Sequence, residues 1–184
     1  MADTARIKSD LAALFADNTT GDISAQDLRD FLESVYPGHA SMYVSSSAAT
    51  TIGSASTYVK VAGTTTSTNL SNFTMPANNR LTYTGTPNIH VHVVVSVSMT
   101  SGSSNQVVGF RVGKTGDATG TDAVASTVQR KIGTGTDIGS TAVNFDTAMS
   151  TNDYLELFIS NETGANDVTC AFMYMFIFGM MSQT

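Results

Sequence analysis

The sequence predicts a mainly β protein, an antiparallel jelly-roll sandwich preceded by a short N-terminal α-helical hairpin. After about residue 50 of the 184, short runs rich in β-branched and aromatic residues alternate with turns of Gly, Asn and Thr, without an intervening helical pattern. Residues 1–38 instead repeat their apolar side chains every three or four positions, which is the period of a helix. We therefore expect a helical hairpin over 1–38, a linker or arm over 39–49 and the jelly roll over 50–184.

The hairpin consists of two short amphipathic helices. Ser24 opens the second helix as a capping box, because its hydroxyl can accept from the amide of Asp27 while the Asp27 carboxylate reaches back. Pro37-Gly38 ends this helix. Helices this short are marginal alone, so each must bury its apolar stripe on a larger assembly or on neighbouring subunits. The candidate docking residues on these stripes are Ile7, Leu11, Leu14, Leu28, Phe31, Leu32 and Val35.

The loop between the two helices has the spacing of a calcium-binding loop but lacks its ligands. With Gly21 at the sixth position, Ala16 and Thr20 occupy the first and fifth positions, where oxygen ligands are needed. The last position is Asp27, which is shorter than the usual bidentate Glu. Turn formers and the helix cap explain the same residues, so we predict no metal and no cofactor here.

The segment 39–49, "HASMYVSSSAA", is small and polar, which favours a linker or an extended arm. Strand-like runs follow it, with the three prolines at element boundaries. In chain order they are "STYVKVAG", "NLSNFTM", "NRLTYTG", "NIHVHVVVSVSMT", "NQVVGFRVGKTG", "VASTVQRKIG", "GSTAVNFDTA", "NDYLELFIS" and "DVTCAFMYMFIFGM".

The closing run is apolar on both faces. Phe172, Tyr174, Phe176 and Phe178 share one face, and Met173, Met175 and Ile177 share the other. One face can enter the core of the sandwich, whereas the other would leave an apolar patch on a monomer. Burial along a three-fold axis resolves this, with a monomer in which the strand is central between the sheets as the alternative. The candidate trimer-interface residues are Phe172, Met173, Tyr174, Met175, Phe176 and Ile177.

Composition excludes several classes of function. The net charge of −6 and the lack of a basic run argue against nucleic-acid binding. The longest apolar run, 171–178, is too short to cross a bilayer, so no membrane partner is expected. The N-terminus lacks the apolar core of a signal peptide, which indicates a protein made in a cytoplasm and not secreted by that route.

No catalytic constellation stands out, so we predict that the chain is not an enzyme and has no catalytic residues. We predict that the single cysteine, Cys170, is a small core residue. The stretch "GKTG" at 113–116 predicts a hairpin turn, because the earlier glycine of a phosphate loop is missing at the right spacing and we expect no helix after it. His90 and His92 alternate on one face of a strand, which favours a polar-face pair. In a trimer, a ring of histidines near the axis would be able to hold a metal or sense pH.

These runs resemble the jelly roll of the tumour necrosis factor and complement globular-head superfamily over about residues 50–180. The resemblance is carried by "STYVKVAGTTTSTNLSNFTMPANNRLTYTG" as opening strands, "IHVHVVVSVS" as the long central strand, "FRVGKTG", "FDTAMSTNDYLELFISNETG" and the closing "TCAFMYMFIFGM". In addition, "LFADNTTGDISAQDLRDFLESV" resembles an N-terminal module of tailed-phage structural proteins that precedes a trimeric β-domain. Together they imply a homotrimeric virion component.

The leading interpretation is a phage capsid decoration (cement) protein or short head fibre that binds the outer capsid surface as a trimer and stabilises the particle. Its expected partners are two further copies of the chain and the major capsid protein or another virion protein. The alternative is a tail-fibre tip, a receptor-binding module that recognises a host surface glycan or protein through its distal loops. A trimeric adhesin of a cell surface is a weaker third option, because it would need a signal peptide.

Overall fold

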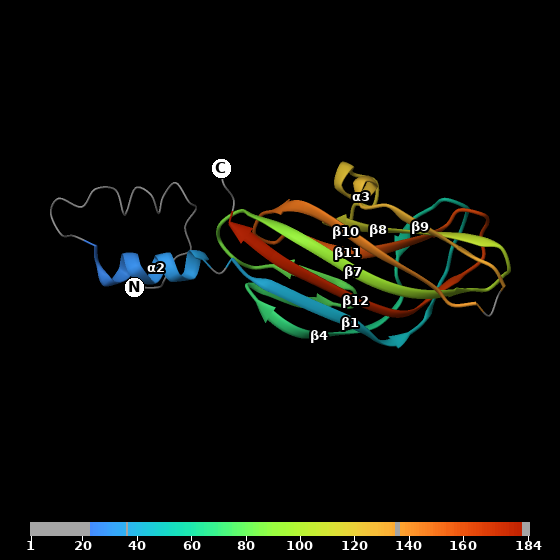
Figure 1. The fold of residues 1–184 in the computed structure, drawn as a ribbon, viewed down its shortest axis with the longest axis horizontal. Coiled ribbons are helices and arrows are strands. Elements are labelled where there is room, and N and C mark those ends of the chain that lie inside the picture. Colours follow the sequence, from blue (N-terminus) through green and yellow to red (C-terminus); the bar gives the residue numbers. More distant parts are fainter. Residues whose placement is uncertain (1–22, 36, 135–136, 182–184) are drawn as a thin grey trace.

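A computed structural model describes residues 23–35, 37–134 and 137–181. They form two antiparallel sheets packed face to face, with helix α2 (Ala25–Val35) projecting from one end of the sandwich (Figure 1). The predicted fold class, a mainly β antiparallel jelly-roll sandwich, is confirmed. The first helix expected in the hairpin, with Ile7, Leu11 and Leu14, lies outside the described residues.

Each sheet has six strands among the described residues. Sheet A has the order β10-β7-β12-β1-β4, and β2 also pairs with β12. Its strands are β1 (His39–Ser47), β2 (Ala49–Thr50), β4 (Gly63–Ser71), β7 (Ile89–Ser101), β10 (Gly139–Met149) and β12 (Val168–Met181). Sheet B has the order β5-β6-β11-β8-β9, and β3 also pairs with β11. Its strands are β3 (Val59–Lys60), β5 (Phe73–Ala77), β6 (Arg80–Tyr83), β8 (Gln106–Lys114), β9 (Val128–Ile132) and β11 (Tyr154–Asn161).

Residues 39–49, expected as a linker or arm, lie inside sheet A. Strand β1 pairs with β4 on one side and β12 on the other, so the sandwich begins at residue 39 and not at residue 50. Ala40 and Met42 point into the core and are fully buried. The serines that follow them are mostly exposed. A strand with two apolar core residues among small polar ones does not stand out from a linker in the sequence.

Helix α2 begins with the hydrogen bonds that the sequence predicts. The amide of Asp27 donates to Ser24 Oγ (3.1 Å), and the Asp27 carboxylate accepts from the amide and the hydroxyl of Ser24 (2.9 and 2.7 Å). Gly38 then turns the chain into β1 with a φ of +112°, where a Cβ would lie 2.5 Å from the Ser71 carbonyl oxygen. A residue other than glycine would therefore be strained and crowded at this step.

The core lies between the two sheets and is built from alternate residues of long strands. On β7 the inward side chains are Ile89, Val91, Val93, Val95, Val97 and Met99, each at most 3% exposed. Cys170 is also fully buried, as predicted, and its thiol donates to the Phe172 carbonyl oxygen at 3.5 Å. Burial raises the pKa of this thiol to about 12, so the group is a neutral core side chain.

One buried amide connects the two sheets. Asn79, with a φ of +51°, donates from Nδ2 to the Leu157 carbonyl oxygen (2.8 Å) and accepts from the Leu157 amide (3.1 Å). Its own amide donates to Thr65 Oγ1 (2.7 Å). Leu157 belongs to sheet B and Thr65 to sheet A, so Asn79 joins the main chain of Leu157 to the side chain of Thr65 across the side of the sandwich.

The turn after β8 is the one expected at "GKTG", since the Asp117 amide donates to the Lys114 carbonyl oxygen (3.0 Å). The five-residue helix α3 (Thr121–Ala125) does follow it, contrary to expectation. The chain thus makes a turn and a short helix where it crosses from β8 to β9.

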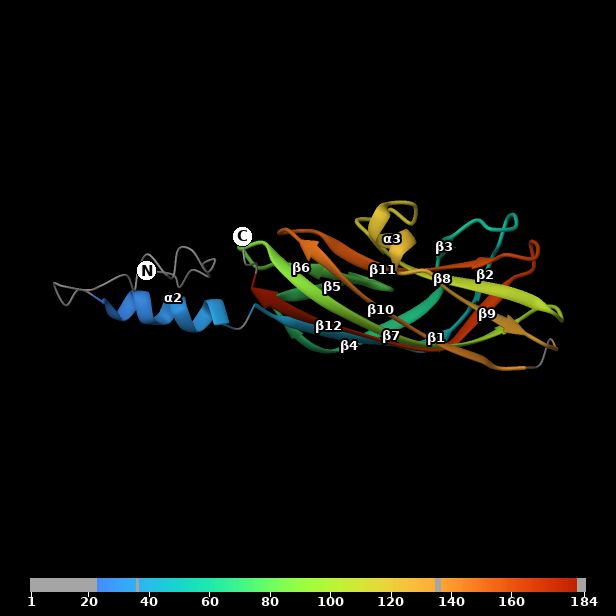
Figure 2. The same ribbon diagram turned by 45° about the horizontal axis from the view of Figure 1, so that its top comes forward.

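The sandwich has two different ends. Antiparallel pairing of His39 with Phe178 places the start of β1, next to α2, beside the end of β12. The opposite end holds the turn 102–105 and the loop 162–167 (Figures 1 and 2). These two segments are joined, because the Gly102 amide donates to the Asp167 carbonyl oxygen (3.0 Å) and Asn161 Nδ2 donates to Gln106 Oε1 (3.0 Å).

Candidate functional site: the outer face of sheet A

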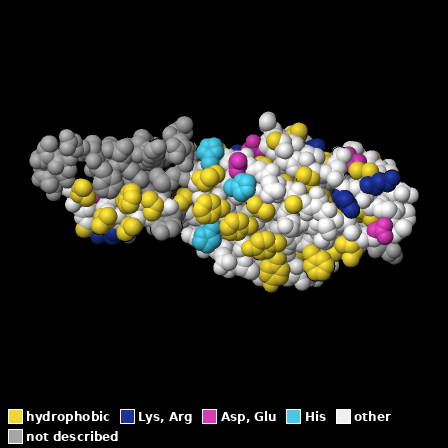
Figure 3. Space-filling model, in the orientation of Figure 1, with side chains coloured by type: hydrophobic (Ala, Val, Ile, Leu, Met, Phe, Trp, Pro, Cys, Tyr) yellow, Lys and Arg dark blue, Asp and Glu magenta, His cyan; other side chains and the backbone are white. Residues whose placement is uncertain are grey.

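A row of large apolar side chains stands on the outer face of β12. Phe172, Tyr174 and Phe178 are 68%, 45% and 52% exposed, and Phe176 between them is partly buried. We call these four residues the aromatic ridge. Tyr43 of β1, opposite Tyr174, extends the apolar surface across the sheet. Figure 3 shows a continuous apolar band on this face, and a contiguous patch of this kind marks an interaction surface.

Three of the six candidate trimer-interface residues lie elsewhere. Met173, Met175 and Ile177 point into the sandwich and are at most 3% exposed. They are core residues of a single subunit, so their assignment to an interface is corrected. Phe172, Tyr174 and Phe176 do lie on the outer face. The two sets alternate along one strand and are equally apolar, so only the position of sheet B decides which set is inside.

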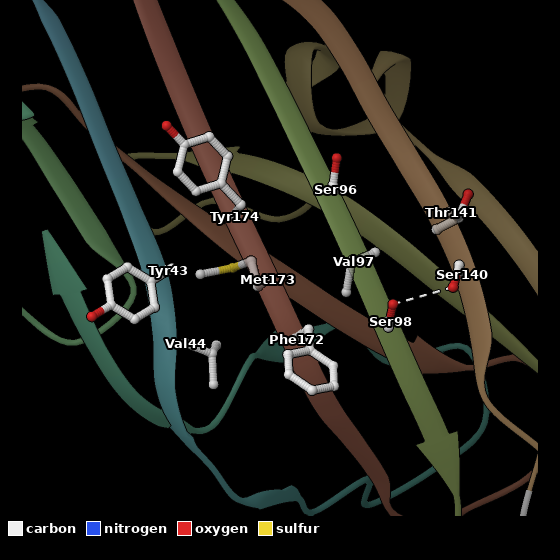
Figure 4. Close-up of a pocket in the computed structure, with 10 residues that line it drawn as sticks. All are labelled: Tyr43, Val44, Ser96, Val97, Ser98, Ser140, Thr141, Phe172, Met173 and Tyr174. Atoms are coloured by element: carbon white, nitrogen blue, oxygen red, sulfur yellow. Dashed lines mark hydrogen bonds between the residues drawn. The ribbon is translucent and has the colours of Figure 1, made fainter. Parts of the chain in front are cut away.

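Beside the ridge the surface is hollow. The hollow has a volume of about 550 Å³ and is lined by residues of β1, β7, β10 and β12 (Figure 4). On β7 and β10 its lining includes the small side chains of Ser96, Ser98 and Ser140, with Ser98 Oγ 3.1 Å from Ser140 Oγ. Phe172 and Tyr174 line it from β12. One face therefore carries both projecting aromatic side chains and a recess next to them.

Charge is distributed unequally between the two sheets. The described strands of sheet A contain no Lys or Arg and only one carboxylate, that of Asp146. The cations of the described sandwich all lie on strands of sheet B: Lys60, Arg80, Arg111, Lys114, Arg130 and Lys131. A face without cations loses little hydration energy when it is covered, so the outer face of sheet A suits burial against protein.

The outer side of sheet B is covered by its own side chains. The Glu156 carboxylate, although outward, is 3% exposed because it accepts from Lys60 Nζ (2.6 Å) and Arg80 Nε (2.7 Å). The Arg111 guanidinium stacks 3.8 Å from the centroid of the Tyr58 ring. These paired charges make a polar surface that needs no partner.

All three histidines lie on strands of sheet A, at the end next to α2 (Figure 3). His39, Phe178, His92 and Asp146 are consecutive partners across β1, β12, β7 and β10. His92 Nδ1 is 2.6 Å from Asp146 Oδ1. His90 is exposed on the same face, paired with Met180 and Ala148. His90 and His92 therefore do share a polar edge of the apolar face.

The structure locates the candidate docking residues of helix α2. On α2, Leu28, Leu32 and Val35 are 53%, 52% and 38% exposed, and Phe31 is partly buried. Figure 3 shows apolar side chains of α2 on the same side of the molecule as the apolar band of sheet A. The helix thus presents an apolar surface that adds to that of the sheet.

Sequence reasoning missed His39 and Tyr43, because residues 39–49 were assigned to a linker. Their alternation with Ala40 and Met42 was the available signal. Over the described ranges, no group of three or more His, Cys, Asp or Glu is arranged to hold a metal ion. No helix in these ranges is long and apolar enough to span a bilayer.

No protein-family model matches the chain, and no curated protein matches it. Solved structures give partial matches. Murine APRIL at pH 5.0 has 9% identity and a TM-score of 0.49, over 76% of this chain and 98% of its own. The PRD1 vertex protein P5 has 9% identity and a TM-score of 0.45, over 80% and 99%. The globular domain of zebrafish complement 1qA protein has 11% identity and a TM-score of 0.36, over 78% and 96%. Likeness at this level concerns the path of the chain and carries no conclusion about function.

Proposed function

We propose that this protein is a non-enzymatic structural component of a phage virion, a capsid decoration (cement) protein or short head fibre. It acts as a homotrimer on the outer surface of the particle. The observation that carries the proposal is the asymmetry between the sheets, with an apolar, cation-free face on sheet A and a charged face on sheet B. The sequence resemblance of the N-terminal segment to tailed-phage modules supplies the virion context.

The trimer forms through the outer face of sheet A. Ridge side chains of one subunit enter the hollow beside the ridge of the next, and three such contacts close a ring. The gain comes from apolar area removed from water, at about 25 cal/mol per Å². Phe172, the most exposed of the ridge residues at 68%, contributes the largest share per side chain.

Helix α2 docks the trimer onto the major capsid protein or another virion protein. Leu28, Leu32 and Val35 supply the apolar contact, and three copies of a weak contact on one trimer give a strong attachment by effective concentration. The trimer stabilises the particle mechanically, because it ties neighbouring capsid subunits together. The sheet and the helix therefore have separate roles, one in assembly and one in attachment.

The copy number of this chain in purified particles tests the proposal. A decoration protein is present in hundreds of copies and a fibre tip in a few to a few dozen, so quantitative mass spectrometry separates them. A low copy number refutes the cement role and favours the receptor-binding alternative. Absence from purified particles refutes both.

Attachment is tested with the full-length Leu28→Ser/Leu32→Ser variant and with Arg29→Ser as the matched control on the same helix. We expect the double variant to remain trimeric and to lose particle binding, and the control to keep both. Full binding by the double variant would show that α2 is not the anchor. Loss of the trimer in the double variant would place the helix in the subunit interface instead.

A further inference from the structure

The three histidines of the chain share the face that the proposed trimer buries. His90 and His92 lie on β7, and His39 lies on β1. Apart from the tyrosines and the buried Cys170, the other ionisable side chain on the described strands of sheet A is Asp146. Histidine is the side chain whose charge changes between about pH 5 and 8. The charge of this face therefore depends on its imidazoles.

His92 has a partner for its positive form. Its Nδ1 lies 2.6 Å from Asp146 Oδ1, and its other neighbour across the sheet is Phe178. An imidazolium in this position keeps a carboxylate beside it when the face is covered. Protonation of His92 therefore costs the interface less than protonation of a histidine without such a partner.

His39 has no carboxylate facing it among the described residues. Its neighbours across the sheet are Phe178 and Ser71. A small hollow of about 190 Å³ surrounds it and is lined by His39 itself and by Val35, Pro37, Gly38, Ser71 and Phe178, none of them charged. Burial under another subunit would leave a protonated His39 in apolar surroundings.

His90 is in a similar position. Its neighbours across the sheet are Met180 and Ala148. The charged groups beside Ala148 are Lys114, whose Nζ donates to the Ala148 carbonyl oxygen at 3.1 Å, and Asp122, whose carboxylate lies 3.5 Å from that Nζ. Asp146, two residues along β10, is already engaged by His92. Asp122 is thus paired with Lys114 and Asp146 with His92, so both carboxylates are already engaged, which disfavours a protonated, covered His90.

We propose that mild acid dissociates the trimer because His39 and His90 must be neutral to be covered. This inference rests on the proposed function, since it specifies how the same sheet A interface is regulated. The free subunit hydrates both imidazolium groups, so it binds more protons than the assembled one. By linkage, the separated state gains as pH falls, and the trimer is favoured at neutral and alkaline pH.

The expected steepness of the pH dependence follows from the number of histidines that must be neutral in the trimer. Two histidines per subunit raise the apparent dissociation constant by up to about 100-fold per subunit for each pH unit below the ordinary imidazole value of about 6.5. A fall from about pH 8 to about pH 5 crosses that range completely. Between about pH 6.5 and about pH 5 the apparent dissociation constant should therefore rise by up to about 1000-fold per subunit.

The test compares the full-length protein at about pH 8 and about pH 5 by sedimentation velocity, with far-UV circular dichroism as the check on folding. We expect folded trimers at the higher pH and folded monomers at the lower pH. The His39→Gln/His90→Gln variant should be trimeric at both. Asp146→Asn should shift dissociation to higher pH, because it removes the carboxylate from His92.

A second variant avoids acid altogether. His39→Lys/His90→Lys carries the two charges permanently and should be monomeric and folded at about pH 8. Wild-type trimers that persist at about pH 5 would overturn this inference and leave the proposed trimer intact, as would trimers of the Lys variant at about pH 8. Wild-type monomers at about pH 8 would instead refute the trimer itself, and this inference with it.

Discussion

Phe172 and Met173 are sequence neighbours on β12 that point to opposite faces, and the pair separates assembly from folding. Phe172 is 68% exposed on the aromatic ridge, and Met173 is 3% exposed in the core. We predict that Phe172→Ala weakens the trimer and leaves the subunit fold intact. Met173→Ala should destabilise the subunit itself.

The magnitudes follow from the burial of each side chain. A Phe side chain buries about 200 Å², and the exposed 68% of Phe172 leaves about 140 Å² for a partner to cover. At about 25 cal/mol per Å² this is about 3.5 kcal/mol per subunit, or a dissociation constant raised by about 300-fold. Met173→Ala removes a buried side chain and leaves a cavity, which costs about 2–5 kcal/mol of unfolding free energy.

The assay measures both quantities for both variants. Sedimentation equilibrium gives the dissociation constant, and urea unfolding, followed at a protein concentration where the subunit is monomeric, gives the free energy of unfolding. Phe172→Ala with an unchanged dissociation constant would show that the ridge is not the interface. An equal loss of unfolding free energy in the two variants would refute the assignment of the two faces.

Three further predictions concern the subunit fold. Asn79→Ala should lower the free energy of unfolding by about 3 kcal/mol or more, since it leaves the buried Leu157 amide without its partner, and thermal unfolding measures this. Ser24→Ala should cost about 1 kcal/mol of α2 stability, seen as faster amide hydrogen exchange in α2 and not in the sandwich. Burial raises the pKa of Cys170 and of Tyr83 to about 12, so both stay neutral in the fold while the unfolded chain ionises them at lower pH. Their contribution to the free energy of unfolding is complete below the ordinary cysteine pKa of about 8.5 and is lost as pH rises toward 12. Urea unfolding should therefore show stability falling through this window. Thiol reagents at about pH 8 should label Cys170 only after denaturation.

The features that depend only on residues close in the sequence were the most predictable. The capping box at Ser24 and Asp27 needs only the residue types and their spacing, and its hydrogen bonds form as expected. The alternation of β7, with His90 and His92 outward and Val91 and Val93 inward, follows equally from a period of two. These features depend on neighbours in the sequence, which is why the sequence specifies them.

Features that depend on distant segments were less predictable. The closing strand offers two apolar faces, and the choice of Met173 over Phe172 as the core residue is made by sheet B, which the strand itself does not encode. Strand β1 was missed because its stability comes from pairing with β4 and β12, which are distant in the sequence, and not from its own composition. The separation of cations onto sheet B becomes visible only once strands are assigned to sheets.

The two unlike ends of the sandwich give the molecule a direction. Helix α2 and the end of β12 lie at one end, and the 102–105 turn lies at the other, joined to its neighbouring loop by the hydrogen bond from Gly102 to Asp167. A surface gripped by the helix would therefore be separated from that turn by the full length of β7. A peptide inserted in the turn would be carried outward on a rigid support, in as many copies as the particle holds subunits, which makes this position the natural one for display.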